Sequence, residues 1–387
     1  MPTKKTDRLN RVLDFLETHI DENHCHEVEQ RHLDALNFKT GAVLPLSFSY
    51  LPKKTELLPF IEAFYDPEAM LYNQLHVERS FGHVVNSVKI KDDYPLHIRS
   101  NHGVIISHSI AGGAYTLSEN TSPWAVPMDC TIGEYRRKWE NRDYDIKNNE
   151  LIKRVCETYQ YMAGRLSEYP KCSRTIRLSH PDMQGPFSIA QLLFGSNFFL
   201  EMYDNPEDVH WLLARITDAF IELFNIMDTL VNNYSAGKEA VYIHGGIYPG
   251  KVLIKNDTSV AMISGEDYAE FCRPYDEKIA KALGGTCIHY CGRTPPFLSK
   301  VMKMPGLAGV NLGDPAMQDV DAMLNDWNSC GIPFISWGNK EPPGFLWESL
   351  HGRVLTGLTL SCAVENVSVS EEIIKGYREK GLAALAA

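Results

Sequence analysis

The spacing of apolar residues predicts helices at the start of the chain. Between residues 7 and 20, apolar side chains recur every three or four positions, as on one face of a helix. A second helix is predicted from about residue 27 to an apolar strand at 42–46. Residues 59–80 also have a helical pattern, with a break and restart at Asp66-Pro67, because proline suits the first turn of a helix.

Beyond residue 98, short apolar runs alternate with longer amphipathic segments. The predicted strands are residues 104–106, 175–178, 240–243, 286–290, 307–312, 334–337 and 355–360. The predicted helices are residues 148–168, 206–231, 265–283 and 319–330, with a last helix from about residue 370. Alternation of strands with crossover helices is typical of a parallel sheet, and so many units in one chain favour an α/β fold of the closed (β/α)8 barrel type. The sequence has no GxGxxG or GxxxxGK[ST] motif, which would have supported an open nucleotide-binding sheet.

Composition and charge disfavour several classes of protein. The formal net charge of the 387 residues is −11, which disfavours a nucleic-acid partner because phosphates require a basic surface. We expect no membrane-spanning helix, since no apolar run reaches roughly 18 residues, and no signal peptide, since residues 1–24 lack its continuous apolar segment. The 9 cysteines are odd in number and are not spaced in pairs, so we expect reduced thiols and a cytoplasmic protein.

The most informative candidate chemistry lies at the end of the predicted strand 286–290. Cys287, His289 and Cys291 occupy alternate positions, and alternate residues of a strand share one face. An imidazole and a thiolate this close together can bind one Zn²⁺ ion, given at least one further ligand. Cys362 ends the last predicted strand and Asp314 follows another, so both are candidates for the remaining positions. The alternative is that each cysteine is simply a small buried apolar residue.

Other polar residues are candidates for binding a substrate. His180, Asp182, His244 and Asn339 each stand just after a predicted strand. In a barrel of parallel strands, the chemistry lies where the strands end and the following loops begin. Each of the four is explained equally well as a loop residue that bonds its own backbone.

Several segments, in this order, resemble the uroporphyrinogen decarboxylase superfamily. They are RHLDALNFKTGAVLPLSF at 31–48, QGPF at 184–187, the helix at 202–220, the segment at 254–279, IHYCG at 288–292 and GNKEP at 338–342. The resemblance covers roughly residues 29–380, so residues 1–28 are expected to form an N-terminal helical extension. It implies that residues 29–387 form a TIM barrel, in agreement with the alternation of strands and helices.

The superfamily divides by chemistry. Its uroporphyrinogen decarboxylases carry RQAGRY and FSDI segments that hold an acidic tetrapyrrole, and this chain has neither. The other branch contains corrinoid-linked demethylation enzymes and zinc methyltransferases that pass a methyl group between a corrinoid protein and a thiol such as coenzyme M. Its zinc pattern is H-x-C followed later by a single cysteine, which His289, Cys291 and Cys362 match in order and approximate spacing. The resemblance thus implies a catalytic zinc on these residues, with Asp314 at the position of a fourth ligand.

The resemblance implies a methyltransferase that moves a methyl group between a methylcobamide and a small thiol or related methylated molecule. The chain has no DxHxxG-type cobalamin-binding sequence, so the methylcobamide is expected on a separate corrinoid protein. Zinc held by two thiolates and an imidazole keeps one position open, where a substrate thiol loses its proton. Two alternatives stay open: a decarboxylase of a carboxylated small molecule, and a barrel that only binds a small molecule or a corrinoid protein, with the zinc structural or absent.

Overall fold

A parallel β-sheet forms the centre of the molecule. The computed structural model describes residues 4–50, 57–76, 84–119, 121–140, 145–231, 240–256, 260–292, 298–314, 317, 330–337, 356–364 and 366–379. Its strands are β1 (Leu46–Tyr50), β2 (His97–Ile98), β3 (Ala114–Thr116), β4 (Trp124–Val126), β5 (Arg177–Leu178), β6 (Ala240–Ile243), β7 (Gly246–Pro249), β8 (Val252–Lys255), β9 (Thr286–Tyr290), β10 (Leu307–Leu312), β11 (Phe334–Trp337) and β12 (Leu358–Val364). Parallel pairing joins six of these strands into a sheet in the order β1-β12-β11-β10-β9-β8. The predicted α/β fold with a parallel sheet is therefore confirmed.

A second parallel pair, β2–β5, is connected to both edges of this sheet. A parallel bridge between Gln184 and Lys255 joins the segment after β5 to β8. The side chains of Asp92 and Asp93, just before β2, accept hydrogen bonds of 2.9 Å from backbone N–H groups of β1. The segments around β2 and β5 therefore lie between the two edge strands of the six-stranded sheet.

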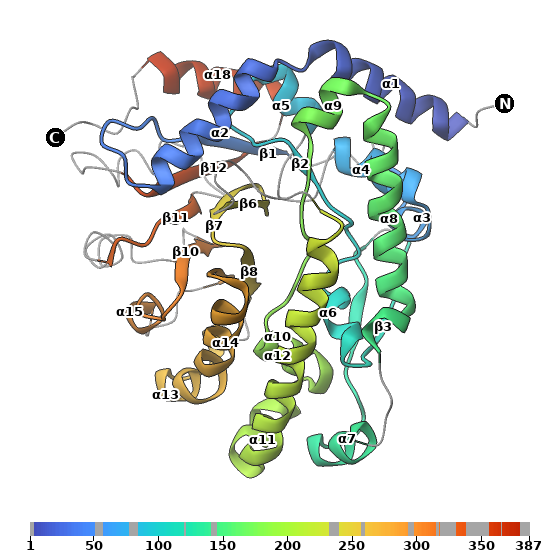
Figure 1. Cartoon of the computed structure of the whole chain (residues 1–387), viewed down its shortest axis with the longest axis vertical. Coiled ribbons are helices and arrows are strands. Elements are labelled where there is room, and N and C mark those ends of the chain that lie inside the picture. Colours follow the sequence, from blue (N-terminus) through green and yellow to red (C-terminus); the bar gives the residue numbers. More distant parts are fainter. Residues whose placement is uncertain are drawn as a thin grey trace.

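Helices cover the sheet and gather at both ends of the molecule (Figure 1). They are α1 (Lys4–His19), α2 (Glu22–Leu36), α3 (Phe60–Tyr65), α4 (Pro67–His76), α5 (Val84–Ile90), α6 (Ile105–Ile110), α7 (Ile132–Trp139), α8 (Glu150–Ser167), α9 (Pro170–Thr175), α10 (Pro186–Phe194), α11 (Asn197–Asp204), α12 (Pro206–Asp228), α13 (Gly265–Asp267), α14 (Arg273–Leu283), α15 (Leu298–Val301) and α18 (Val367–Glu379). In Figure 1, α1, α2, α9 and α18 lie at one end, and α7, α11 and α13 lie at the other. The main hydrophobic core lies between the sheet and its helices, where α12 buries Leu212, Phe220 and Leu223.

One predicted strand is wrong and another is shorter than predicted. Ile105 and Ile106 begin helix α6, because a short apolar run carries no periodicity that separates a strand from a buried helix. Of the predicted strand 175–178, only the last two residues are a strand, since Thr175 ends α9. The remaining predicted strands beyond residue 98 correspond to β6, β9, β10, β11 and β12. Most of the predicted helix at 319–330 lies outside the described residues.

Helix α1 and the start of α2 cover the residues that were predicted as an N-terminal extension. Helix α1 corresponds to the predicted helix at 7–20 and packs against α4, α5 and α9. Helix α2 begins earlier than predicted because the side chain of Asp21 accepts a backbone N–H and caps it. An ion pair between Arg31 and Asp93 holds α2 on the segment before β2. The predicted domain boundary between residues 28 and 29 thus falls inside one continuous helix.

A β-hairpin packs against one face of the sheet, called here the inner face. Strands β6 and β7 pair antiparallel and are joined by His244 and Gly245, whose φ angles are 50° and 84°. Two consecutive positive φ values are typical of the tight turns that join hairpin strands. Val241 and Tyr248 of the hairpin share a buried cluster with Cys287 of β9. The opposite face of the sheet, which packs against the main core, is called here the helix-facing side.

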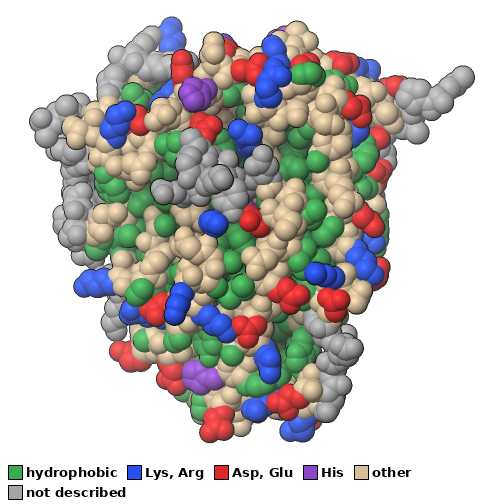
Figure 2. All heavy atoms as spheres, viewed as in Figure 1, with side chains coloured by type: hydrophobic (Ala, Val, Ile, Leu, Met, Phe, Trp, Pro, Cys, Tyr) green, Lys and Arg blue, Asp and Glu red, His purple; other side chains and the backbone are tan. Residues whose placement is uncertain are grey.

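The surface in view carries charges of both signs. Figure 2 shows Lys and Arg side chains interspersed with Asp and Glu side chains and with apolar groups. This face is therefore not the uniformly basic surface that a nucleic-acid backbone requires. In the part of the chain that the structure describes, no helix is both long and apolar enough to cross a membrane.

Candidate active site

A row of hydrogen-bonded groups, made of the side chains of His289 and Asn311 and the backbone carbonyl of Ile335, crosses three neighbouring strands on the inner face. Asn311 of β10 pairs in register with His289 of β9 on one side and with Ile335 of β11 on the other. The Asn311 side chain hydrogen-bonds to Nδ1 of His289 through Oδ1, and its Nδ2 donates to the Ile335 carbonyl oxygen at 2.6 Å. His289 and Asn311 are each 2% exposed, so the row is inaccessible to bulk water.

Two of the candidate metal ligands, His289 of β9 and Cys291 just after it, lie together. Nε2 of His289 is 3.0 Å from Sγ of Cys291. The backbone of Gly313 lies close against this pair, and only a glycine allows this, because a Cβ atom at that position would lie 3.1 Å from the Cys291 sulfur. Asp314 follows directly, and its Oδ2 accepts a 2.7 Å hydrogen bond from the backbone N–H of Gly292. The candidate fourth ligand is therefore tied to the residue after Cys291.

Cys362 lies on the helix-facing side of β12. It packs with Leu360 and Val364 in the main core, whereas Cys287 belongs to the cluster on the inner face. Burial raises the pKa of the Cys362 thiol to about 12. Within the described ranges, no group of three or more His, Cys, Asp or Glu side chains is arranged to hold a metal ion. The structure thus brings His289 and Cys291 together and places Cys362 on the opposite face of the sheet.

A buried ion pair lies near the end of β8. Nζ of Lys255 is 2.8 and 2.9 Å from the two carboxylate oxygens of Asp182, and a guanidinium nitrogen of Arg99 is 3.9 Å from the same carboxylate. Burial alone would raise the pKa of Asp182, but the charges of Lys255 and Arg99 outweigh it and lower the pKa to about 2. The predicted substrate-binding carboxylate is therefore ionised and already engaged by cations.

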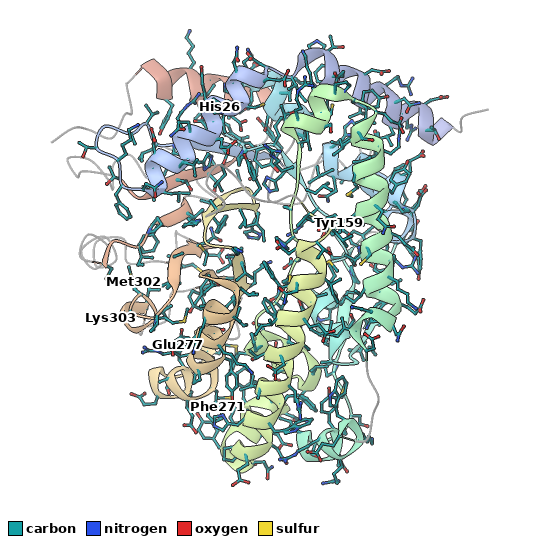
Figure 3. All side chains as sticks on the ribbon, in the orientation of Figure 1. His26, Tyr159, Phe271, Glu277, Met302 and Lys303 are labelled. Carbon is teal, nitrogen blue, oxygen red and sulfur yellow. The ribbon has the colours of Figure 1, made fainter. Side chains whose placement is uncertain are left out.

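His180 belongs to the same segment as Asp182 but has different surroundings. Its ring stacks on Phe224 of α12 with centroids 4.6 Å apart, and its Nε2 lies 3.4 Å from an oxygen of Asp228. Tyr159 extends from α8 toward this segment (Figure 3) and donates a 2.6 Å hydrogen bond to the Ser179 carbonyl. The segment after β5 is thus held by α8 and α12, and His180 contacts α12.

His244 lies beside His289. The turn of the β6–β7 hairpin brings the two ring centroids to 4.9 Å, with an interplanar angle of 66°. Burial, followed by the charge of Lys255, holds the pKa of His244 well below its ordinary value. A neutral imidazole therefore lies beside His289, one of the candidate metal ligands.

Sequence reasoning missed three residues of this site: Lys255, Asn311 and Gly313. A signal was present along β10 and the residue after it, where positions 309, 311 and 313 alternate as Cys287, His289 and Cys291 do along β9 and just beyond it. The pairing of the two strands was needed to use it, because alternation within one strand does not identify its partner. Asn339, the remaining predicted substrate-binding residue, lies outside the described residues.

Comparison with known proteins agrees with the motif-based resemblance. Residues 182–329 match the family model described as uroporphyrinogen decarboxylase (URO-D). The chain is 30% identical over 171 residues to the methylcobamide:CoM methyltransferase MtbA of Methanosarcina acetivorans, covering 43% of this chain and 43% of that protein. It is 25% identical over 285 residues to the MtbA of Methanosarcina mazei, covering 65% of this chain and 76% of that protein. The match to the first relative thus spans less than half of its length. Together these similarities support the resemblance of the chain to the uroporphyrinogen decarboxylase superfamily, on its corrinoid methyltransferase branch.

Proposed function

We propose that this protein is a zinc-dependent methyltransferase that moves a methyl group between a methylcobamide, carried by a partner corrinoid protein, and a thiol or related small acceptor. The observation that carries the proposal is the contact of 3.0 Å between His289 Nε2 and Cys291 Sγ at the end of β9. Both relatives are named methylcobamide:CoM methyltransferases, and from this name we take methylcobamide as the methyl donor and a thiol as the acceptor. We place the protein in the cytoplasm, where thiols stay reduced.

The paired donors suit a zinc ion. An imidazole nitrogen and a thiolate sulfur are its usual ligands, at about 2.0–2.1 and 2.3 Å. The hydrogen bond between His289 and Asn311 occupies Nδ1, so Nε2 is the ring nitrogen that faces Cys291. Asp314 is proposed as a further ligand because its carboxylate already lies at the residue after Cys291.

Cys362 remains the proposed third ligand, and it would have to turn to the inner face to bind. A shift of one residue in the register of a strand moves its side chains to the opposite face. The pairing of β11 with β12 is already irregular between Phe334 and Trp337. We propose that a local change in β12 would complete a ligand set of His289, Cys291 and Cys362.

The proposed chemistry needs a deprotonated substrate thiol. Zinc, when bound, would supply this by lowering the pKa of a coordinated thiol. Because Gly313 has no side chain, its backbone can lie close to Cys291 and His289 without crowding them. His244 offers the substrate a neutral ring, because its lowered pKa keeps a further positive charge away from the site. The ion pair of Asp182 and Lys255 adds one negative and one positive charge, at fixed positions, to the surroundings of the proposed substrate.

We also propose that the parallel strands close into a TIM barrel. The ring would run through β1, β2, β5, β8, β9, β10, β11 and β12. Three observations support this closure: the pairing of β2 with β5, the Gln184–Lys255 bridge to β8, and the hydrogen bonds of Asp92 and Asp93 to β1. The candidate ligands would then lie at the carboxyl ends of the strands, where barrel enzymes carry their chemistry.

A decarboxylase of a carboxylated small molecule is the second candidate. The observation in its favour is the pair of buried cations, Arg99 and Lys255, each 8% exposed. Such cations can hold a substrate carboxylate. This reaction would need no metal, which separates it from the first proposal.

The deciding experiment is the metal content of the purified protein, followed by transfer of a methyl group from methylcobalamin to small thiols. We expect zinc in the wild type and its loss in His289→Ala and Cys291→Ser. His210→Ala is the matched control, since His210 is 40% exposed and stacks on Phe271, which Figure 3 labels at the opposite end from α2. Wild-type protein that binds no zinc and transfers no methyl group would contradict the proposal and direct the search to acidic substrates.

A further inference from the structure

We propose that Asn311 is a positioning residue that holds His289 in one ring orientation and one tautomer, with the proton on Nδ1 and the lone pair of Nε2 facing Cys291. The functional importance of this positioning rests on the proposed function, in which His289 binds a metal ion. The tautomer itself is a property of the metal-free chain, so the two proposals can fail separately.

The hydrogen bonds determine the orientation of the Asn311 amide. A carbonyl oxygen can only accept a hydrogen bond, so the group of Asn311 that lies 2.6 Å from the Ile335 carbonyl is its NH₂. The amide oxygen must then point the other way, toward His289. Because strand register places Asn311 between these two residues, this direction is determined by the backbone of β9, β10 and β11.

The amide orientation in turn determines the tautomer of His289. An amide oxygen has no proton to donate, so the Nδ1 atom that it meets must be the protonated nitrogen. In a neutral ring, Nε2 then carries the lone pair. The Cys291 sulfur, 3.0 Å away, is placed to donate its thiol proton to this lone pair. The same nitrogen and sulfur would be the atoms available to hold a metal ion.

A neutral amide is well suited to this position. Histidines that bind metals commonly donate their second ring N–H to a carboxylate or carbonyl oxygen, which fixes the ring before the metal arrives. His289 and Asn311 are buried, so an unpaired Nδ1–H would be costly and the hydrogen bond is strongly favoured. An uncharged acceptor achieves this without adding a charge to a buried site.

The test compares Asn311→Leu with Asn311→Asp by nitrogen NMR of metal-free protein labelled in its histidine rings. Leucine removes the acceptor at similar volume, whereas aspartate keeps an oxygen toward Nδ1. Protonated and unprotonated ring nitrogens resonate far apart, and His289→Gln identifies the His289 signals among those of the 14 histidines. We expect Nδ1 protonated in the wild type and in Asn311→Asp, and a substantial population with Nε2 protonated in Asn311→Leu.

Zinc affinity, measured by competition with a chelator, gives the second readout. We expect a loss of roughly 10–100-fold in Asn311→Leu and a smaller loss in Asn311→Asp. Asn73→Leu is the matched control. The Asn73 amide, in another part of the chain, likewise accepts a hydrogen bond from an N–H group and donates one to a carbonyl, both in the backbone of Leu58. It should lower stability without changing the His289 signals or the zinc affinity.

Two results would overturn the proposal: Nε2 protonated in the wild type, or His289 signals that are the same in Asn311→Leu as in the wild type. The wild-type spectrum alone decides the first point, even if Asn311→Leu does not fold. If the tautomer changes as expected and the wild type binds no zinc, the positioning role stands and the metal proposal fails.

Discussion

The buried pair of Asp182 and Lys255 should stabilise the protein only while both partners are present. Nζ lies within 2.9 Å of both carboxylate oxygens, and the two side chains are 9% and 10% exposed. Asp182→Asn removes the negative charge and leaves the ammonium group of Lys255 buried. Breaking a buried pair in this way costs about 3–5 kcal/mol. This is a large part of the roughly 5–15 kcal/mol that stabilises a typical folded protein.

The assay is urea unfolding of the wild type, Asp182→Asn and an exposed control. Asp34→Asn is the control, because Asp34 pairs at 2.7 Å with Lys39, whose side chain is 62% exposed. An exposed pair contributes about 0–1 kcal/mol. Adding Lys255→Met to Asp182→Asn should restore part of the lost stability, since it removes the uncompensated charge. The reasoning is refuted if Asp182→Asn costs no more than Asp34→Asn, or if Lys255→Met destabilises the Asp182→Asn protein further.

Three further predictions concern the space, the acid response and the ligands of the site. Gly313→Ala places a Cβ atom 3.1 Å from the Cys291 sulfur, and crowding of about 1–3 kcal/mol should weaken zinc binding about 5–150-fold. The control is Gly164→Ala in α8, where a Cβ atom would meet nothing within 4 Å. It should add about 0.5–1 kcal/mol of stability and leave the zinc affinity unchanged. Equal zinc affinities in Gly313→Ala and Gly164→Ala would argue against crowding. The pKa of Asp182 is lowered from 3.8 to about 2, so its ionised form stabilises fully above about pH 4, and roughly 2 kcal/mol is lost as the pH falls toward 2. Acid titration of the unfolding free energy should therefore show a steeper fall in the wild type than in Asp182→Asn, and parallel curves would contradict this. Cys362→Ser should lower the zinc content of the purified protein, and an unchanged content would mean that Cys362 stays on the helix-facing side.

Local sequence was sufficient where the structure depends on position along one element. The alternation of His289 and Cys291 predicted that their side chains share a face, and the distance of 3.0 Å confirms it. The period of apolar residues between positions 7 and 20 likewise predicted α1. In both cases the direction of a side chain follows from the repeat of the backbone itself.

The same reasoning could not tell which face of the sheet a residue occupies when the answer depends on strand pairing. Cys362 was expected beside His289, and the register of β12 with β1 places it opposite Phe48 on the helix-facing side.

Ile105 was assigned to a strand, although it begins a helix, because a run of three apolar residues is too short to show a period.

The sequence by itself determined the α/β class, the resemblance to the superfamily and the close pair His289 and Cys291, since these depend on local periodicity and on motifs. Only the tertiary structure decided that Asn311 faces His289, that Lys255 engages Asp182, and that the hairpin turn brings His244 to the same place. These contacts join residues from 22 to 73 positions apart. Their partners are chosen by sheet register and core packing, which no short segment of sequence contains.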